Sequence, residues 1–386
     1  KITTIPAGLF ASITGDARRL AFMGTFQDCK NLTKIPAGLF DSLNLTDLDM
    51  GGDYGVFTET FAGCSSLTGP SAQTASGEYL YDVWSADSVD ELAPDMYRGD
   101  NGLDDFYTMP AYLTGASIFT VTTTRGTKTF AFELSALGDF YVDWGDGQSE
   151  YISRTEDDDS AQIYSHTYDT AGTYTIGFGG PATGYLQKSG EMYTATAIRF
   201  GDSGDGDLTC DIASMSGKLG FVFPTLDDGT QPIFNSTFAN CYYLTKIPDG
   251  LFDGISGVTS SMFQNTFIGT GISEIPDTLF AGLDGYVESE MFSGTFANCE
   301  HLTKIPVGLF DSLVQSGVDG ENFSSGFVGT FANCANLTGP SAQTADGVYL
   351  YNLDGFTKRF GWGMYAEDYG LSDYDTMPDY LKEASE

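Results

Sequence analysis

The chain has 386 residues, of which 53 are acidic and 17 are basic, for a formal net charge of -36 at pH 7. This charge repels a phosphate backbone and argues against nucleic acid as a partner. No apolar run approaches the ~20 residues that a membrane span requires. With 41% apolar residues, the chain has enough material for several buried cores.

A long internal repeat organises the sequence. Residues 1–81 align with residues 271–351 without a gap, and 42 of the 81 aligned positions are identical. Farther along, the offset slips to 268, so that Thr108-Met109-Pro110 matches Thr376-Met377-Pro378. The sequence therefore predicts a tandem unit of about 270 residues, of which the 386 residues hold about one and a half.

A shorter repeat lies inside the long one. Its pattern, Thr-Phe-x-x-Cys-x-x-Leu-Thr-x-Ile-Pro-x-Gly-Leu-Phe, appears at 25–40, 237–252 and 295–310, with variants elsewhere. Alternating Leu-Thr-Lys-Ile predicts a short strand that proline ends, and Gly-Leu-Phe predicts a helical turn. Segments of this length bury their apolar side chains against neighbouring segments, so the pattern predicts solenoid blocks.

This element resembles the leucine-rich repeats of the treponemal or BspA-like type. The resemblance implies an α/β solenoid of bacterial surface proteins, used for adhesion or display, and it brings no catalytic residue. We expect solenoid blocks over 1–80 and 183–345. Residues 81–117 are expected to form a cap and linker, and residues 346–386 a second cap.

Residues 118–182 follow a different pattern. Segments rich in threonine and aromatic residues, such as 119–124 and 173–178, are separated by Gly and Asp turns and predict the short strands of a sandwich. Val142-Asp143-Trp144-Gly145-Asp146-Gly147, followed by His166-Thr167-Tyr168, resembles a PKD domain, which implies an immunoglobulin-like spacer module of secreted and surface proteins. Trp144 is predicted to fill the sandwich core.

Two acidic clusters offer the oxygen ligands that calcium prefers. One contains Asp202, Asp205 and Asp207, and the other spans 156–159. Solvated turns are the alternative, because the first cluster lacks the downstream Glu of an EF-hand loop. No other cofactor is expected.

Five of the six cysteines, Cys29, Cys64, Cys241, Cys299 and Cys334, share one repeat position, which Thr270 fills in another repeat. A small buried side chain therefore suits the position, and we expect buried free thiols there. Cys210 stands outside the pattern. It can pair with Cys241 only if their α-carbons approach within about 7 Å.

The chain has two histidines, His166 and His301. His166 belongs to the sandwich motif, where a structural hydrogen bond is expected, and His301 fills a variable repeat position. No Ser-His-Asp, zinc or phosphate-loop constellation has motif spacing. The sequence therefore predicts a protein without enzymatic activity.

Aromatic residues gather after the last repeat of each block, at 79–84 and again at 349–352, where Phe356, Phe360, Trp362 and Tyr365 follow. We interpret them as caps over the ends of the blocks. A contact surface for a glycan, a protein or the next module is the alternative.

These features predict an extracellular or cell-surface structural protein of bacterial type, a stalk, filament or appendage of tandem 270-residue units that contact one another. An adhesin that binds a surface glycan or host protein through the solenoid faces is the alternative. Because Ile2, Ile5, Leu9 and Phe10 would form an exposed apolar layer, we expect a preceding repeat or a neighbouring subunit to cover them.

Overall fold

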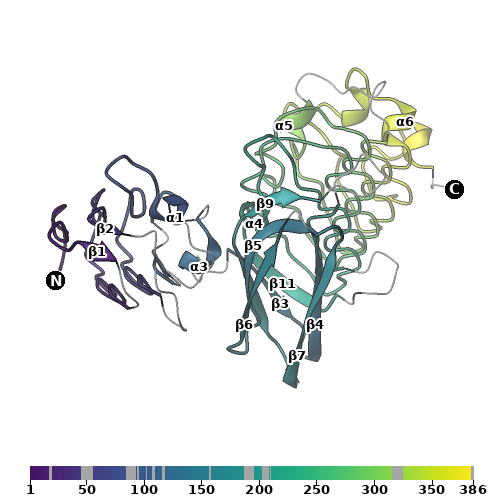
Figure 1. Ribbon diagram of the computed structural model, residues 1–386. Helices are drawn as coiled ribbons and strands as arrows, with labels where there is room; N and C mark the ends of the chain where they lie inside the picture. Colours follow the sequence, from purple (N-terminus) through teal and green to yellow (C-terminus); the bar gives the residue numbers. More distant parts are fainter. Residues whose placement is uncertain are drawn as a thin grey trace. The chain divides into compact units, whose positions relative to one another are not determined.

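The structure is a computed structural model that describes most of the chain (Figure 1). The described residues are 1–16, 20–44, 55–83, 93, 95–100, 102–106, 109–114, 118–155, 158–186, 195–201, 208, 210–314 and 325–383. The chain divides into two compact units. Unit 1 comprises residues 1–118 with 139–142 and 178–181, and unit 2 comprises the rest.

Most strands lie between residues 119 and 217, and most of the short helices lie outside this range. The strands are β1 (Gly15–Asp16), β2 (Leu43–Asn44), β3 (Phe119–Thr123), β4 (Thr127–Leu134), β5 (Ala136–Asp143), β6 (Ser149–Arg154), β7 (Gln162–Gly172), β8 (Thr175–Gly179), β9 (Ala182–Tyr185), β10 (Ile198–Arg199) and β11 (Ile212–Gly217). The helices are α1 (Leu80–Val83), α3 (Ala111–Thr114), α4 (Leu219–Val222), α5 (Asp311–Val314), η1 (Leu350–Asn352), α6 (Lys358–Gly361) and η2 (Asp379–Leu381). Within the described ranges, no helix has the length and apolar character needed to cross a membrane.

The longer strands build two sheets. One sheet has the order β11-β3-β8-β5-β6, with β9 also paired to β5, and the other has the order β10-β4-β7. The pairs β11–β3, β4–β7, β10–β4 and β5–β9 are antiparallel. Side chains of β3 alternate between buried and half-buried, as expected for a strand with one face on a core. The strands predicted between residues 118 and 178 are therefore present.

Aromatic side chains fill the space between these two sheets. Trp144, which follows β5, is 2% exposed, and its ring lies 5.9 Å from that of Phe132 on β4. Phe200 packs 6.2 Å from Phe132 and 6.2 Å from Phe119 on β3. The prediction that Trp144 belongs to the core is confirmed.

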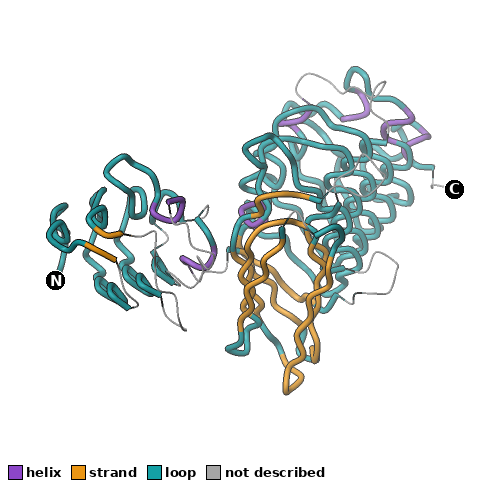
Figure 2. The backbone as a smooth tube through the Cα atoms, in the orientation of Figure 1, coloured by secondary structure: helices purple, strands orange, loops and turns teal. Residues whose placement is uncertain are grey.

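The predicted α/β leucine-rich-repeat solenoid blocks are wrong. Most of the regular structure in the described residues is antiparallel β-sheet between 119 and 217, and no helix exceeds four residues. The repeat segments are drawn almost entirely as loop in Figure 2. At 32–35, 244–247 and 302–305, where the sequence predicted strands, the backbone is irregular. The predicted domain limits on either side of 118–182 stay predictions, and β10 and β11 join the sheets from beyond residue 182.

Left-handed residues explain the absence of regular helix and strand in the repeats. In one segment, Glu290, Gly294 and Asn298 have φ of 57°, 63° and 59°. A residue with positive φ interrupts both the right-handed helix and the extended strand. Because such a residue recurs every four positions, the backbone forms successive tight turns.

Backbone N–H groups in these turns alternate between two kinds of acceptor. Ser293 N–H and Thr295 N–H donate to carbonyls three residues earlier, at 3.1 Å each. Between them, Gly294 N–H donates to Val328 of the next repeat segment at 2.9 Å. Each segment therefore binds the following one through every second residue.

Rows of aromatic rings run through both repeat regions. In unit 2 one row contains Phe238, Phe267, Phe296, Phe331 and Tyr365, whose successive centroids lie 5.5, 5.6, 5.5 and 5.9 Å apart. In unit 1 the row contains Phe26, Phe61 and Tyr97, at 5.3 and 5.8 Å. Each row ends in a tyrosine, which brings a hydroxyl group into the last segment of each copy.

Candidate functional site

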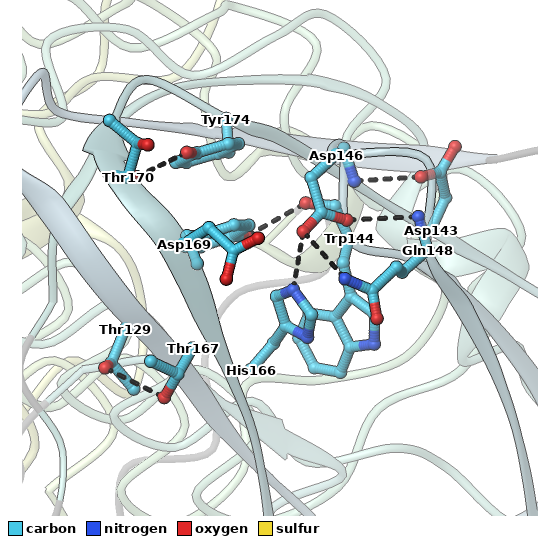
Figure 3. Close-up of polar contacts among 12 residues, drawn as sticks. Thr129, Asp143, Trp144, Asp146, Gln148, His166, Thr167, Asp169, Thr170 and Tyr174 are labelled. Atoms are coloured by element: carbon cyan, nitrogen blue, oxygen red, sulfur yellow. Dashed lines mark hydrogen bonds and ion pairs between the residues drawn. The ribbon is translucent and has the colours of Figure 1, made fainter.

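His166 lies in the hydrogen-bonded cluster that Figure 3 shows. Its Nε2 is 2.8 Å from Oδ2 of Asp146, and its ring stacks on Trp144 with centroids 5.1 Å apart. Tyr168 packs against the imidazole edge and donates its hydroxyl to the Trp144 carbonyl at 2.9 Å. Strand β7 therefore presents His166 and Tyr168 to the turn that follows β5.

The carboxylate of Asp146 also stabilises the turn in which it lies. Oδ1 accepts from the Gln148 N–H at 3.0 Å, and the hydrogen bond from His166 is the main cause that lowers the pKa of Asp146. Among the described residues, the hydrogen bond of the His166 ring is the one to Asp146. This agrees with the structural role predicted for His166, while His301 is exposed.

The predicted calcium ligands Asp202, Asp205 and Asp207 lie outside the described residues, as do 156 and 157 of the second cluster. Of that cluster, Asp158 accepts from Thr155 N–H through Oδ2 at 2.8 Å, so its carboxylate closes a local turn. Within the described ranges, no group of three or more His, Cys, Asp or Glu side chains could hold a metal ion. Calcium binding stays a prediction.

The cysteines follow the repeat, with one exception. Cys64, Cys299 and Cys334 are buried free thiols and Cys29 is a half-buried one. Burial raises the pKa of Cys64 to about 12 and that of Cys299 to about 11. The expectation of a free thiol is wrong for Cys241, which forms a disulfide with Cys210 across a Cα–Cα distance of 5.0 Å.

The same buried carboxylate network closes the last segment of each copy. In unit 1, Asp105 Oδ1 accepts from Ser71 N–H at 2.9 Å, and its Oδ2 accepts from Ser71 Oγ at 2.6 Å and from the Tyr81 hydroxyl at 3.0 Å. In unit 2, Asp373 accepts from Ser341 and Tyr351 at 2.9, 2.7 and 3.0 Å. Each carboxylate thus accepts these three hydrogen bonds from a serine and a tyrosine of the same unit.

A second contact ties the aromatic rows to these networks. The hydroxyl oxygen of Tyr97 accepts from Ala72 N–H at 3.0 Å, and that of Tyr365 accepts from Ala342 N–H at 3.1 Å. Both tyrosines are almost fully buried. Beside each network a tyrosine pair stacks at 5.1 Å, Tyr79 on Tyr81 in unit 1 and Tyr349 on Tyr351 in unit 2.

One buried carboxyl in each copy lacks full hydrogen bonding. Asp100 and Asp368 occupy the cysteine position of the last segment and are both 0% exposed. Oδ1 of Asp368 accepts from the Cys334 N–H at 2.7 Å. Its Oδ2 and both carboxyl oxygens of Asp100 have no hydrogen-bond partner among the described residues. Burial raises the pKa of each carboxyl to about 8, so both are mostly protonated at neutral pH.

Sequence reasoning missed these carboxyl groups, although a signal was present. With the offset of 268, Tyr97-x-x-Asp100 matches Tyr365-x-x-Asp368, and Asp105 matches Asp373. These matches lie within 96–117, where 13 of 22 positions are identical to the residues 268 positions later, directly after the diverged stretch 83–95. The return of identity at polar as well as apolar positions marks a shared contact.

The networks of Asp105 and Asp373 hold repeat segments together, and the His166–Asp146 pair joins β7 to the turn after β5. Comparison of the chain with protein-family models, with curated proteins and with solved structures gave no match.

Proposed function

We propose that the protein is a non-enzymatic, extracellular structural protein that uses its 270-residue unit as a spacing element of a stalk, filament or surface appendage. The observation that carries the proposal is the duplicated closing network. Asp105 and Asp373 make the same three hydrogen bonds at distances that agree within about 0.1 Å. A unit boundary built twice in the same way suits an array whose function depends on repeated dimensions.

Two further properties support this function. The net charge of -36 favours solubility and limits unspecific association. The Cys210–Cys241 disulfide is compatible with an oxidising compartment outside the cytosol. The partners in this proposal are other units of the same protein.

Electron microscopy of the native material, combined with intact-mass measurement under denaturing conditions, tests the proposal. We expect extended particles with a regular repeat and a polypeptide that carries several units. Dispersed monomers near 41.4 kDa would contradict it.

An adhesin is the second candidate, and two exposed tyrosines favour it. Tyr242 and Tyr243 are 66% and 60% exposed and adjacent in the chain. Exposed aromatic rings offer flat apolar faces for a sugar or a protein side chain. In the next repeat but one, the same two positions carry Glu300 and His301.

That repeat supplies a control for the adhesin proposal. The double variant Y242E/Y243H places in one segment the residues that another segment already accommodates, so the fold should be kept. If the tyrosines bind a ligand, a glycan or surface-protein binding assay will lose signal in the double variant. Equal binding by both forms would reject the adhesin role of this surface.

A further inference from the structure

Matched apolar positions of the two copies differ in exposure. Three side chains near the beginning of the first copy are exposed, whereas the residues 270 positions later are buried. The pairs are Ile2 at 44% and Ile272 at 0%, Leu9 at 44% and Leu279 at 3%, and Ile13 at 47% and Leu283 at 4%. The sequence is therefore suited to burial at these positions, and the first copy lacks a covering layer there.

The preceding repeat segment provides the cover in the second copy. Phe252 and Phe263 pack on Phe280 with ring centroids 6.1 and 4.9 Å away. In the first copy the equivalent ring is Phe10, which is only half-buried. The covered face in unit 2 thus indicates that phenylalanine rings are the side chains that fit against the matching face of unit 1.

The backbone shows the same difference. In the second copy, Phe263, Asn265, Phe267 and Gly269 donate their N–H groups to four carbonyls, those of Met291, Ser293, Thr295 and Ala297, at 2.8 to 2.9 Å. The equivalent carbonyls of the first copy belong to Ala21, Met23, Thr25 and Gln27. No hydrogen bond from another described residue reaches any of these four. They form a row of acceptors, spaced two residues apart, beside the exposed apolar side chains.

The other ends of the repeat regions are covered. In unit 2, Phe200 N–H donates to the Thr237 carbonyl at 2.8 Å at one end, and Tyr365 N–H donates to the Leu381 carbonyl at 2.9 Å at the other. In unit 1, Tyr97 N–H donates to the Leu113 carbonyl at 2.7 Å. At the ends that carry donors, central N–H groups of the last segment are therefore already bonded within the same unit, so such an end of another molecule offers the row of acceptors fewer donors than residues 263–269 offer in the second copy.

We propose that the face formed by residues 2–16 and 20–27, here called the open face, is a docking surface for a repeat segment with the chemistry of residues 234–270, joined to it in the same polypeptide. Such a segment supplies phenylalanine rings for the apolar positions and an N–H donor at every second residue for the carbonyl row. The inference rests on the proposed structural function and assigns one surface to contact between units.

A graft tests this assignment in the full chain. A copy of residues 195–270 is fused before Lys1, which aligns with Gly271, so that the join has the same register as the native one. The readout is the labelling rate of a cysteine introduced by Leu9→Cys, resolved by peptide mass spectrometry. Leu279→Cys in the ungrafted chain is the control for a covered position.

We expect Leu9→Cys to react rapidly in the ungrafted chain and on the order of tenfold or more slowly in the grafted chain, because labelling would then require local opening. A second graft, in which the copies of Phe252 and Phe263 are changed to Asp, should restore rapid labelling. Equal rates with and without the first graft would overturn the proposal.

Self-association is a separate outcome. If Leu9→Cys in the ungrafted chain becomes protected as protein concentration rises, the face binds a second molecule and the assignment is wrong. Because labelling is measured on purified chain in dilute solution, its result is independent of whether electron microscopy finds extended native particles. Each proposal can therefore fail without the other.

Discussion

The Tyr351 hydroxyl donates to the buried carboxylate of Asp373 at 3.0 Å, and Ser341 supplies two more donors to the same carboxylate. Tyr81 makes the same bond to Asp105 in the other copy. The bond joins η1, which contains Tyr351, to the turn between α6 and η2, which contains Asp373. The network therefore fixes the turn that contains Asp373 against Ser341 and Tyr351, a contact that the aromatic rows do not make.

Asp373→Asn should destabilise unit 2 by about 2 kcal/mol, because hydrogen bonds to a charged acceptor contribute about 1.5–3 kcal/mol. Asp105→Asn should have a similar effect on unit 1. Urea unfolding measures both, with Asp354→Asn as an exposed control expected to change the free energy by less than about 0.5 kcal/mol. An equal decrease in the free energy of unfolding for Asp354→Asn would contradict a specific contribution of the network to stability.

The raised pKa of Asp368 predicts that the free energy of unfolding decreases as pH rises. Its folded pKa of about 8 lies above the roughly 3.9 of an unfolded Asp. The folded state therefore binds the extra proton, and the stability this carboxyl contributes is lost as pH rises from about 4 to about 8, by about 1.4 kcal/mol per pH unit. Asp368→Asn should gain stability relative to the native chain over this window.

Unfolding free energies of both forms at pH 5, 7 and 8.5 check the effect. Comparing the two forms cancels the many other carboxylates. A constant difference between variant and native chain across the three pH values would contradict a raised pKa at Asp368.

The disulfide prediction concerns both pairing and reactivity. Non-reducing mass spectrometry should find Cys210–Cys241 as a bridge and the other four cysteines reduced. Among the free thiols, half-buried Cys29 should be alkylated first, because burial keeps Cys299 and Cys334 protonated and covered. Reducing the bridge, whose sequence separation is 31, should cost about 3–4 kcal/mol by the loop-entropy model.

Matched leucines test the exposure difference between the copies. Leu279→Ala should destabilise the protein by about 2–5 kcal/mol, as expected for a buried leucine. Leu9→Ala, at the same position of the repeat, should cost less than about 1 kcal/mol because its side chain is 44% exposed. Thermal and urea unfolding of the two variants give the comparison. Equal losses would show that Leu9 is covered in solution.

Sequence reasoning located the β-strands and the buried Trp144, because alternating threonine and aromatic residues directly report a strand with one buried face. It failed for the repeats. Leu32-Thr33-Lys34-Ile35 alternates in the same way, yet its backbone is irregular. Four consecutive residues were too short to identify a strand, and the signal that mattered was elsewhere, in the four-residue spacing of Glu290, Gly294 and Asn298.

The candidate site was predictable only in part. The hydrogen bond of His166 follows from its motif, but no sequence pattern identifies the partner of Asp105, because Ser71 lies 34 residues away. The Cys210–Cys241 bridge depends on a distance that spacing alone does not fix. Such long-range pairs require the repeat segments to be placed against one another.

The alternating hydrogen bonds also permit changes of chain length between segments. Phe234 and Phe263 donate to residues 28 positions ahead, Met262 and Met291, whereas Phe292 donates to Gly326, 34 positions ahead. The added residues fall outside the stretch that pairs with its neighbour, so the register of the rings and carbonyls is the same in each case. Insertions of several residues between the paired stretches can therefore accumulate without disturbing the array, and these positions in the sequence are the places where a new epitope or tag could be introduced.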